Sequence, residues 1–312
     1  MKIYSVGIIG LGKIGYKYDC NVNNDYVFLT HFKSFLRHKR FKVTWVCDKN
    51  ENLLENVKKV NKGLSIEYFS DYRAIEINTD VVVISTPKKF MEQIIDRFIS
   101  RRSIKCILIE KPFAISSKIL NKYLKNENKI IVNYIRRFLP FYKNIKKEID
   151  SKLDKLSFIT VKFSGGMLSN GSHFFNLFNF LFPSHRLYSK SCQNNLNEFK
   201  LSDSKNEIKI NMLSYKTIDF ELFEIDFFFK DLLIRVSDME KKVSFYETDF
   251  DNIFQNSRTI KLKKELTTDI GRYGLHSCEA VIQLIEKKKN LSSINDEYKS
   301  IELIDKNCFE IK

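Results

Sequence analysis

The sequence predicts an α/β domain with a parallel sheet, followed by an α+β domain with an open, mainly antiparallel sheet. Over the first ~125 residues, short apolar runs alternate with helical patterns, as in a parallel sheet with crossover helices. After about residue 150, strand-like runs alternate apolar and polar residues, which is typical of antiparallel strands with one solvated face. We therefore divide the chain into domains 1–125 and 126–312.

Each element of the first domain is predicted from its own run of residues. Continuous apolar runs, which fit strands buried on both faces, predict strands at 4–11, 41–47, 81–85, 104–109 and 130–134. Polar stretches with helical periodicity predict helices at 30–37, 51–60, 91–99 and 117–124.

The second domain shows the alternating pattern. Period-two runs predict strands at 155–164, 207–213, 217–222, 242–246 and 259–262. Two helices are predicted within it, at 172–181 and 275–286, the second with Val281, Leu284 and Ile285 on one face.

Composition excludes several classes of protein. The chain of 312 residues is 43% hydrophobic and 29% charged, the balance of a soluble globular protein. It has no run of ~18 apolar residues, so we expect no membrane partner and a cytoplasmic location. Six cysteines without a C-x-x-C pair predict free thiols and no metal site. The net charge of +15 is spread along the chain, which favours anionic small ligands over nucleic acid.

The most informative motif is Gly10-Leu11-Gly12-Lys13-Ile14-Gly15, a G-x-G-x-x-G sequence between a predicted strand and a helix. In a Rossmann fold, Gly10 permits the tight turn, Gly12 lets the backbone approach a pyrophosphate, and Gly15 lets helix and strand pack closely. The free amides at the start of the helix, around Lys13 and Ile14, would bind the phosphates. A glycine-rich turn without a ligand is the alternative.

Asp48 at the end of the second predicted strand strengthens the dinucleotide interpretation. A carboxylate there accepts hydrogen bonds from both ribose hydroxyls of an adenosine and repels a 2′-phosphate. NAD is therefore favoured over NADP, although Lys49 beside it weakens that preference. The alternative is that Asp48 is a turn residue at a strand end.

Further motifs follow in order: Ser85-Thr86-Pro87, Glu110-Lys111-Pro112, the run 133–138, and the run 165–173 with Asn170 and His173. In this order they resemble the Gfo/Idh/MocA family (glucose-fructose oxidoreductase and inositol dehydrogenase) over nearly the whole chain. The resemblance implies an open antiparallel sheet that faces the nicotinamide and packs against other subunits, hence a homo-oligomer. It implies that Ser85, Thr86, Pro87, Glu110 and Lys111 join the cofactor site.

The same resemblance implies two catalytic residues, Lys111 and His173. A hydride that moves at carbon must be matched by a proton that moves at oxygen, and a desolvated lysine or an imidazole can exchange that proton. An exposed loop lysine and a histidine packed in a first helical turn are the alternatives. Lys88 and Met91 depart from the family pattern after Pro87, where Asn and His are usual.

Substrate binding is expected from Lys111, Tyr134, Arg136, Ser169, Asn170 and His173. Arg136 could bind a phosphate or carboxylate, or form a salt bridge. Ser169 stands where the family commonly has Asp, and a hydroxyl cannot act as a carboxylate base.

The sequence therefore predicts an NAD-dependent oxidoreductase that acts on a ring hydroxyl or ketone of a sugar. By resemblance, that substrate is a nucleotide sugar of surface-polysaccharide synthesis. A catalytically silent NAD-binding sensor or regulator with the same fold is the alternative, and a nucleic-acid-binding protein is a third.

Overall fold

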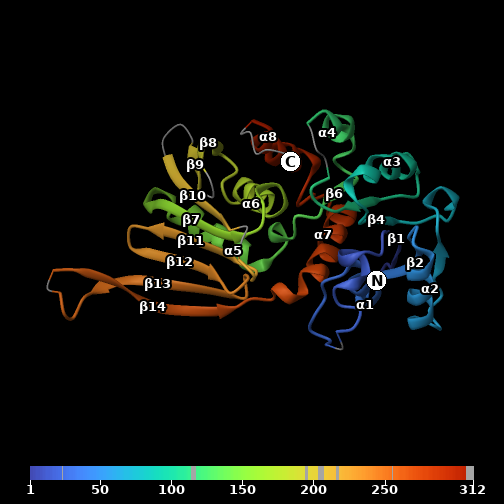
Figure 1. Cartoon of the computed structure of the whole chain (residues 1–312), viewed down its shortest axis with the longest axis horizontal. Coiled ribbons are helices and arrows are strands. Elements are labelled where there is room, and N and C mark those ends of the chain that lie inside the picture. Colours follow the sequence, from blue (N-terminus) through green and yellow to red (C-terminus); the bar gives the residue numbers. More distant parts are fainter. Residues whose placement is uncertain are drawn as a thin grey trace. The chain divides into compact units, whose positions relative to one another are not determined.

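The computed structural model describes residues 1–22, 24–113, 117–193, 196–202, 207–215, 218–254 and 256–306 (Figure 1). The chain forms two compact units. The first consists of Met1–Phe138 together with Gly271–Tyr298, and the second of Leu139–Ile270 together with Lys299–Lys312. The boundary expected near residue 125 thus lies inside the first unit, to which a late segment of the chain also returns.

The first unit contains a six-stranded sheet in the order β3-β2-β1-β4-β5-β6, with every neighbouring pair parallel. Its strands are β1 (Tyr4–Ile9), β2 (Phe41–Cys47), β3 (Glu67–Phe69), β4 (Val81–Ile84), β5 (Cys106–Ile109) and β6 (Ile130–Val132). All residues of β4 and β5 are buried, as expected for central strands covered on both faces. The carboxyl ends of all six strands meet at one edge of the sheet.

Helices α1 (His31–Arg37), α2 (Glu51–Val60), α3 (Lys88–Ile99) and α4 (Ser117–Tyr123) connect these strands. The side chains of Thr30 and Asn50 accept hydrogen bonds from backbone N–H groups in the first turns of α1 and α2, which fixes where both helices begin. Helix α3 buries Met91, Ile94, Ile95 and Phe98.

Helix α7 (Tyr273–Lys287), although distant in sequence, completes the core of the first unit. Its residues Cys278, Val281 and Leu284 belong to the same buried cluster as Val6 and Phe35. The helix is capped after Lys287 by Lys288, whose backbone is left-handed. Helix α8 (Ile294–Lys306) follows and starts in the first unit.

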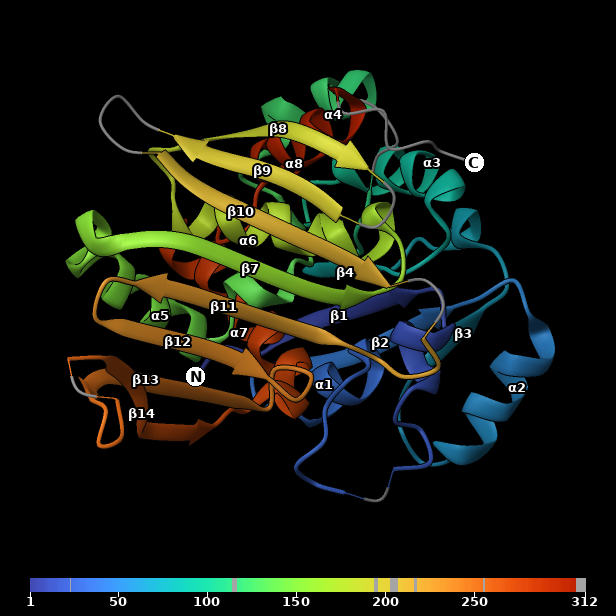
Figure 2. The same ribbon diagram turned by 60° about the vertical axis from the view of Figure 1, so that its left-hand side comes forward.

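The second unit contains an eight-stranded sheet in the order β14-β13-β12-β11-β7-β10-β9-β8 (Figure 2). Only β7 and β10 pair in parallel among the described residues; the other neighbouring pairs are antiparallel. The strands are β7 (Leu156–Ser164), β8 (Arg186–Gln193), β9 (Leu196–Ser202), β10 (Glu207–Tyr215), β11 (Phe223–Phe229), β12 (Leu232–Ser237), β13 (Lys242–Phe250) and β14 (Arg258–Thr267). The predicted fold class, a parallel α/β domain followed by a mainly antiparallel α+β domain, is confirmed.

Helices α5 (Pro140–Ser151) and α6 (Ser172–Leu181) lie behind this sheet in the view of Figure 2. Phe174 of α6 packs against Phe163 of β7 and stacks on Phe223 of β11, with ring centroids 5.1 and 4.2 Å away. Aromatic side chains from helix and sheet thus form the core of the second unit.

One predicted strand is wrong. Thr217 lies outside the described residues, and residues 218–222 are not part of a strand, with a bend at residues 219–220. Alternation of Ile218, Phe220 and Leu222 suggested a strand, but Phe220 is 63% exposed and the sheet strand begins only at Phe223. The pattern alone did not show that residues 218–221 leave the sheet.

Among the described residues, no helix combines the length and the apolar character needed to span a bilayer.

Candidate active site

The glycine loop follows β1 and is shaped by two close contacts. Gly10 has a φ of +91°, and a Cβ there would lie 2.6 Å from the carbonyl oxygen of Ser85. A Cβ on Gly15 would lie 2.0 Å from the carbonyl oxygen of Gly10. Both positions therefore require glycine.

Gly12 differs from its neighbours, because a Cβ there would meet nothing within 4 Å. The space in front of Gly12 is open, so its glycine is not explained by packing within the chain. Lys13 and Ile14 follow in a short π-helix (Lys13–Lys17), where the prediction had the next helix begin. The backbone N–H groups of Tyr16 and Lys17 both donate to the carbonyl oxygen of Gly12.

Asp48 follows β2 and is tied to the glycine loop. Its Oδ2 accepts a hydrogen bond of 2.7 Å from the backbone N–H of Leu11, and its Oδ1 accepts one of 2.9 Å from that of Asn50. The carboxylate thus joins two neighbouring strand ends, and its remaining lone pairs can accept further donors.

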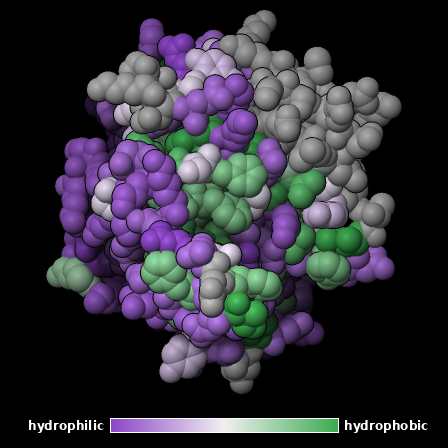
Figure 3. Space-filling model, turned by 90° about the vertical axis from the view of Figure 1, so that its left-hand side faces the viewer, coloured by the Kyte–Doolittle hydropathy of each residue, from purple (hydrophilic) through white to green (hydrophobic). Residues whose placement is uncertain are grey.

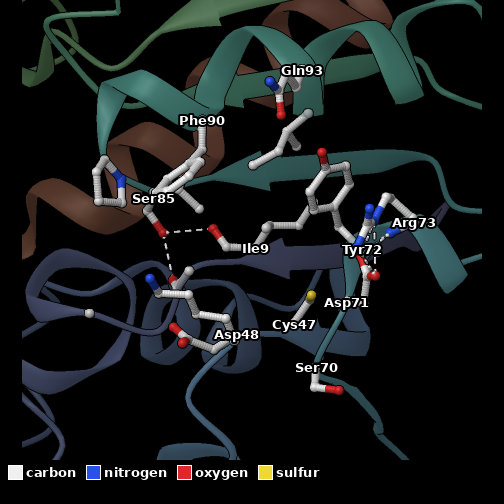
Figure 4. A pocket seen from close by; sticks show the side chains of 16 residues that line it. Ile9, Cys47, Asp48, Ser70, Asp71, Tyr72, Arg73, Ser85, Phe90 and Gln93 are labelled. Carbon is white, nitrogen blue, oxygen red and sulfur yellow. Dashed lines mark hydrogen bonds and ion pairs between the residues drawn. The ribbon is translucent and has the colours of Figure 1, made fainter.

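A cavity of about 480 Å³ opens at the carboxyl ends of β1 to β4 (Figure 4). In the figure Phe90 and Gln93 lie along one side of it and Asp48 and Ser70 along the other. The predicted residues that line it are Gly10, Gly12, Asp48, Ser85, Thr86 and Pro87. A cavity of this size suits an adenosine-sized ligand.

Two details of the cavity fit a bound dinucleotide. Thr86 Oγ1 is buried and has no hydrogen-bond partner among the described residues, so it is available to a ligand hydroxyl or amide. The open space at Gly12 is what a pyrophosphate requires of the second glycine of this motif. Ser85, in contrast, is structural, because its hydroxyl donates to the carbonyl oxygen of Gly10 at 2.7 Å.

Sequence reasoning missed the outer wall of this cavity. Tyr72 and Arg73 come from a short 3-10 helix after β3, and Arg73 pairs with Asp71 at 2.7 Å. Strand β3 has only three residues, so no periodic pattern marked it. The predicted residues Lys13, Ile14, Gly15, Glu110 and Lys111 do not line this cavity.

Glu110 and Lys111 follow β5, the strand next to β4 in the sheet. The Oε1 atom of Glu110 lies 2.7 Å from His31 Nε2 and accepts a 2.7 Å hydrogen bond from Asn133 Nδ2. Burial disfavours the charged carboxylate, but these two contacts and the nearby Lys111 outweigh it, and the pKa of Glu110 lies below its usual value.

Lys111 is half-buried and its pKa is lowered to about 8. Burial, which disfavours the ammonium, is the main cause, and the positive charge of Arg136 acts in the same direction. The carboxylates of Glu110 and Glu297 act in the opposite direction. The Lys111 amine therefore changes its charge near neutral pH, as a proton donor or acceptor requires.

The residues after β6 are buried in the first unit. Tyr134 is 1% exposed, and Arg136 and Arg137 are each 8% exposed. Arg137 forms a salt bridge of 2.8 Å to Asp296, which belongs to the same unit. The positive charge of Arg136 contributes to the lowered pKa of Lys111, so the two cations of the first unit act on one another electrostatically.

The remaining predicted residues lie around the turn that precedes α6 in the second unit. Asn170 Nδ2 donates to the carbonyl oxygen of Ser164 at 2.7 Å, and Ser169 Oγ donates to that of Gly166 at 3.1 Å. Ser169 is exposed, and His173 is half-buried in the first turn of α6. Asn170 also borders a cavity of about 230 Å³ together with Ser164, Gly165, Tyr215 and residues 218–221.

Among the described residues, no group of three or more His, Cys, Asp or Glu side chains is placed to hold a metal ion.

A parallel sheet with this glycine loop and this cavity at its carboxyl edge defines a dinucleotide-binding Rossmann domain. Residues 4–133 match the oxidoreductase family with an NAD-binding Rossmann fold, Gfo/Idh/MocA. Over this region the chain matches that family, and the resemblance seen in its motifs is confirmed. The comparison with curated proteins gives no match.

Solved structures share the fold over almost the whole chain. A dehydrogenase from Chromobacterium violaceum is 14% identical, with 99% of this chain and 95% of that chain covered at a TM-score of 0.76. A super-repressor mutant of Gal80p from Saccharomyces cerevisiae is 12% identical, with 98% and 95% covered at 0.74. A variant of KijD10, a 3-ketoreductase from Actinomadura kijaniata in complex with TDP-benzene and NADP, is 11% identical, with 98% and 97% covered at 0.71. At these identities the likeness concerns the fold alone.

Proposed function

We propose that this protein is an NAD-dependent oxidoreductase that moves hydride to or from a ring hydroxyl or ketone of a sugar. One observation carries the proposal: the half-buried Lys111 follows β5, and the neighbouring strand β4 ends at the dinucleotide cavity. A proton-exchanging group is thus positioned on the same edge of the sheet as the cofactor site.

The cofactor would be held by residues of the first unit. The amides of the glycine loop would bind its pyrophosphate, Asp48 its adenosine ribose, and Thr86 Oγ1 a polar group nearer the nicotinamide. The carboxylate of Asp48 in the cavity wall supports NAD over NADP. When bound, the nicotinamide supplies or accepts the hydride.

Lys111 would complete the redox step at oxygen. In the oxidising direction the alcohol loses a hydride from carbon, and its hydroxyl proton passes to the neutral amine of Lys111. In the reducing direction the ammonium of Lys111 returns that proton to the new alkoxide. A pKa of about 8 makes both forms of the amine accessible near neutral pH.

His173 is proposed as the helper that hydrogen-bonds the reacting hydroxyl, with Asn170, Tyr134 and Arg136 binding the substrate. Ser169 would only bind or orient, because its hydroxyl is not a base at neutral pH. The proton transfer is therefore assigned mainly to Lys111, with the His173 imidazole as its helper.

A nucleotide sugar is the proposed substrate class. The buried guanidinium of Arg136 beside Lys111 and the net charge of +15 favour an anionic substrate. The 3-ketoreductase KijD10, which shares the fold, was solved with a thymidine diphosphate compound.

The purified protein tests this function directly. Calorimetry should detect NAD or NADH binding, and nicotinamide absorbance should change with one or more members of a panel of nucleotide sugars, free sugars and cyclic polyols such as myo-inositol. Absence of binding by either cofactor, oxidised or reduced, contradicts the proposal.

A catalytically silent NAD-binding regulator is the second candidate. Ser169 in place of the family's usual carboxylate favours it, and the fold is shared with a super-repressor form of Gal80p. This candidate predicts NAD binding without any change of nicotinamide absorbance across the same panel.

We also propose that copies of the chain associate through the open sheet of the second unit. Figure 3 looks onto the side of the molecule that lies at the left in Figure 1. Apolar patches are visible there among hydrophilic residues. Phe250, Ile260 and Leu262 of β13 and β14 are 65%, 47% and 55% exposed, although such side chains usually lie inside. Light scattering should report an oligomer, which Ile260→Asp with Leu262→Asp should dissociate; a monomeric parent protein contradicts this proposal.

A further inference from the structure

A chain of buried and partly buried hydrogen bonds leads from α7 to the carboxylate beside Lys111. Ser277 Oγ donates to Asn133 Oδ1 at 2.8 Å, Asn133 Nδ2 donates to Glu110 Oε1 at 2.7 Å, and His31 Nε2 lies 2.7 Å from the same oxygen. His31, Asn133 and Ser277 are 3%, 2% and 1% exposed. All four residues belong to the first unit, and three of them come from outside the Glu-Lys-Pro motif.

The directions of these bonds follow from chemistry. An ionised carboxylate only accepts, so His31 must carry its proton on Nε2. The hydroxyl of Ser277 donates to Asn133 Oδ1, and this turns the NH₂ group of Asn133 toward Glu110. The backbone N–H of Asn133 donates to the carbonyl oxygen of Ile109 at 2.8 Å. This hydrogen bond holds the backbone of Asn133 in place, so that its side-chain amide lies next to Glu110. Two donors therefore converge on one carboxylate oxygen.

Burial at this position favours the neutral form of the Glu110 carboxyl, whereas the donated hydrogen bonds favour its anionic form. With them it stays anionic next to Lys111. The charged groups that influence the Lys111 amine are Glu110 beside it, Arg136 after β6 and Glu297 of α8. Burial is the main cause that raises the pKa of Tyr273 in α7. The negative charges of Glu110 and Asp19 add to this increase, and the positive charge of Arg136 opposes it.

We infer that His31 is a positioning residue: by donating to Glu110 it keeps a negative charge beside Lys111 and so sets the pH range over which the Lys111 amine exchanges its proton. The catalytic meaning of this inference rests on the proposed function. His31 does not act on the substrate; it acts through Glu110.

The direction of the effect can be derived. Without the His31 donor, the anionic form of Glu110 is less stable, and the carboxylate offers less negative charge to Lys111. The charged form of the Lys111 amine then loses part of the electrostatic stabilisation that offsets the cost of its burial. The pH at which this amine is half-protonated, its titration midpoint, therefore falls. Replacement of His31 by leucine should lower this midpoint by about one pH unit, the smaller end of the range for a lost charge partner.

The test measures the Lys111 amine itself. The rate at which an amine-modifying reagent labels Lys111 is followed against pH by mass spectrometry, in the full chain without cofactor or substrate. His31→Leu should shift the midpoint downward, and His31→Gln, which offers an amide donor, should restore it. His38→Gln is the matched control, because His38 Nε2 also pairs with a glutamate, Glu279 at 3.0 Å, but that carboxylate is 56% exposed. This control should leave the midpoint unchanged.

Ser277→Ala provides a second variant if His31→Leu does not fold. It removes only the hydroxyl that orients Asn133 and should shift the midpoint in the same direction by a smaller amount. An unchanged midpoint in both His31→Leu and Ser277→Ala overturns the inference. An equal shift in His31→Leu and His31→Gln also overturns it.

Turnover, where present, should show the same displacement in its pH profile. Because labelling needs no substrate, a protein without hydride-transfer activity would refute the proposed function and still leave the role of His31 measurable.

Discussion

The carboxylate of Asp48 accepts a hydrogen bond of 2.7 Å from the backbone N–H of Leu11, so the end of β2 holds the middle of the glycine loop. The residue expected to bind a ribose therefore also shapes the loop expected to bind the phosphates. Replacement of Asp48 should have two separable effects.

Asp48→Ala should weaken NAD binding by about tenfold, or ~1.4 kcal/mol, through loss of the ribose acceptor. It should also narrow the preference for NAD over NADP, because the negative charge opposite a 2′-phosphate is gone. Calorimetry with both cofactors measures this. Asp249→Ala, at an exposed carboxylate of β13 paired with Lys261, is the control and should change neither affinity.

Two glycines of the loop should respond differently to alanine. Gly15→Ala places a Cβ 2.0 Å from a carbonyl oxygen and should destabilise the fold by about 1–3 kcal/mol. Gly12→Ala meets no atom of the chain and should leave unfolding by urea unchanged while NAD affinity falls, because the methyl group occupies the pyrophosphate space. Equal NAD affinity in the wild type and Gly12→Ala would show that this space is not used.

Lys111→Met should lower turnover by about 10²- to 10⁴-fold, the usual contribution of a general acid or base, with NAD affinity retained. Stopped-flow hydride transfer and calorimetry separate the two quantities. Full turnover in this variant would remove Lys111 from the mechanism.

The pH dependence of turnover should reveal the direction of the proton. Oxidation needs the neutral amine, so its rate should rise as pH increases through about 8, and reduction needs the ammonium, so its rate should fall over the same range. A rate of oxidation that is flat from pH 7 to 9, measured with chemistry rate-limiting, contradicts the assignment.

The thiols should differ sharply in reactivity. Burial raises the pKa of the Cys106 and Cys278 thiols, whereas Cys20 is exposed. Maleimide should therefore modify Cys20 in the native protein and reach Cys106 and Cys278 only after unfolding. Peptide mass spectrometry reads the order, and early labelling of Cys278 would contradict the placement of α7 in the core.

Local sequence patterns predicted those elements whose first or last residues carry a clear signal, such as a capping side chain. Strand β2 and helices α2 and α6 match their predicted bounds, and Asn50 caps the first turn of α2. Strand β3 is too short to show a period, and β11 and the start of β12 lie in a run, 223–234, whose mixed apolar and charged residues carried no strand prediction. The return of α7 to the first unit depends on packing that no local window contains.

The candidate site shows the same contrast between residues in local motifs and contacts that depend on packing. The glycine loop, Asp48 and Ser85-Thr86-Pro87 are contiguous motifs and could be read directly. The contact of His31 with Glu110 joins residues separated by 79 positions, and its existence depends on how α1 packs beside the end of β5. A histidine in a helix that carries no motif of its own gave no signal of that contact.

The place of α7 in the first unit has a consequence during protein synthesis. The nascent chain presents all six parallel strands long before the ribosome has made residues 273–287, whose apolar side chains complete that core. The first unit must therefore wait, with part of its interior uncovered, until residues 273–287 have been translated. A stop codon just after the sixth strand should consequently give a fragment that depends on chaperones or aggregates.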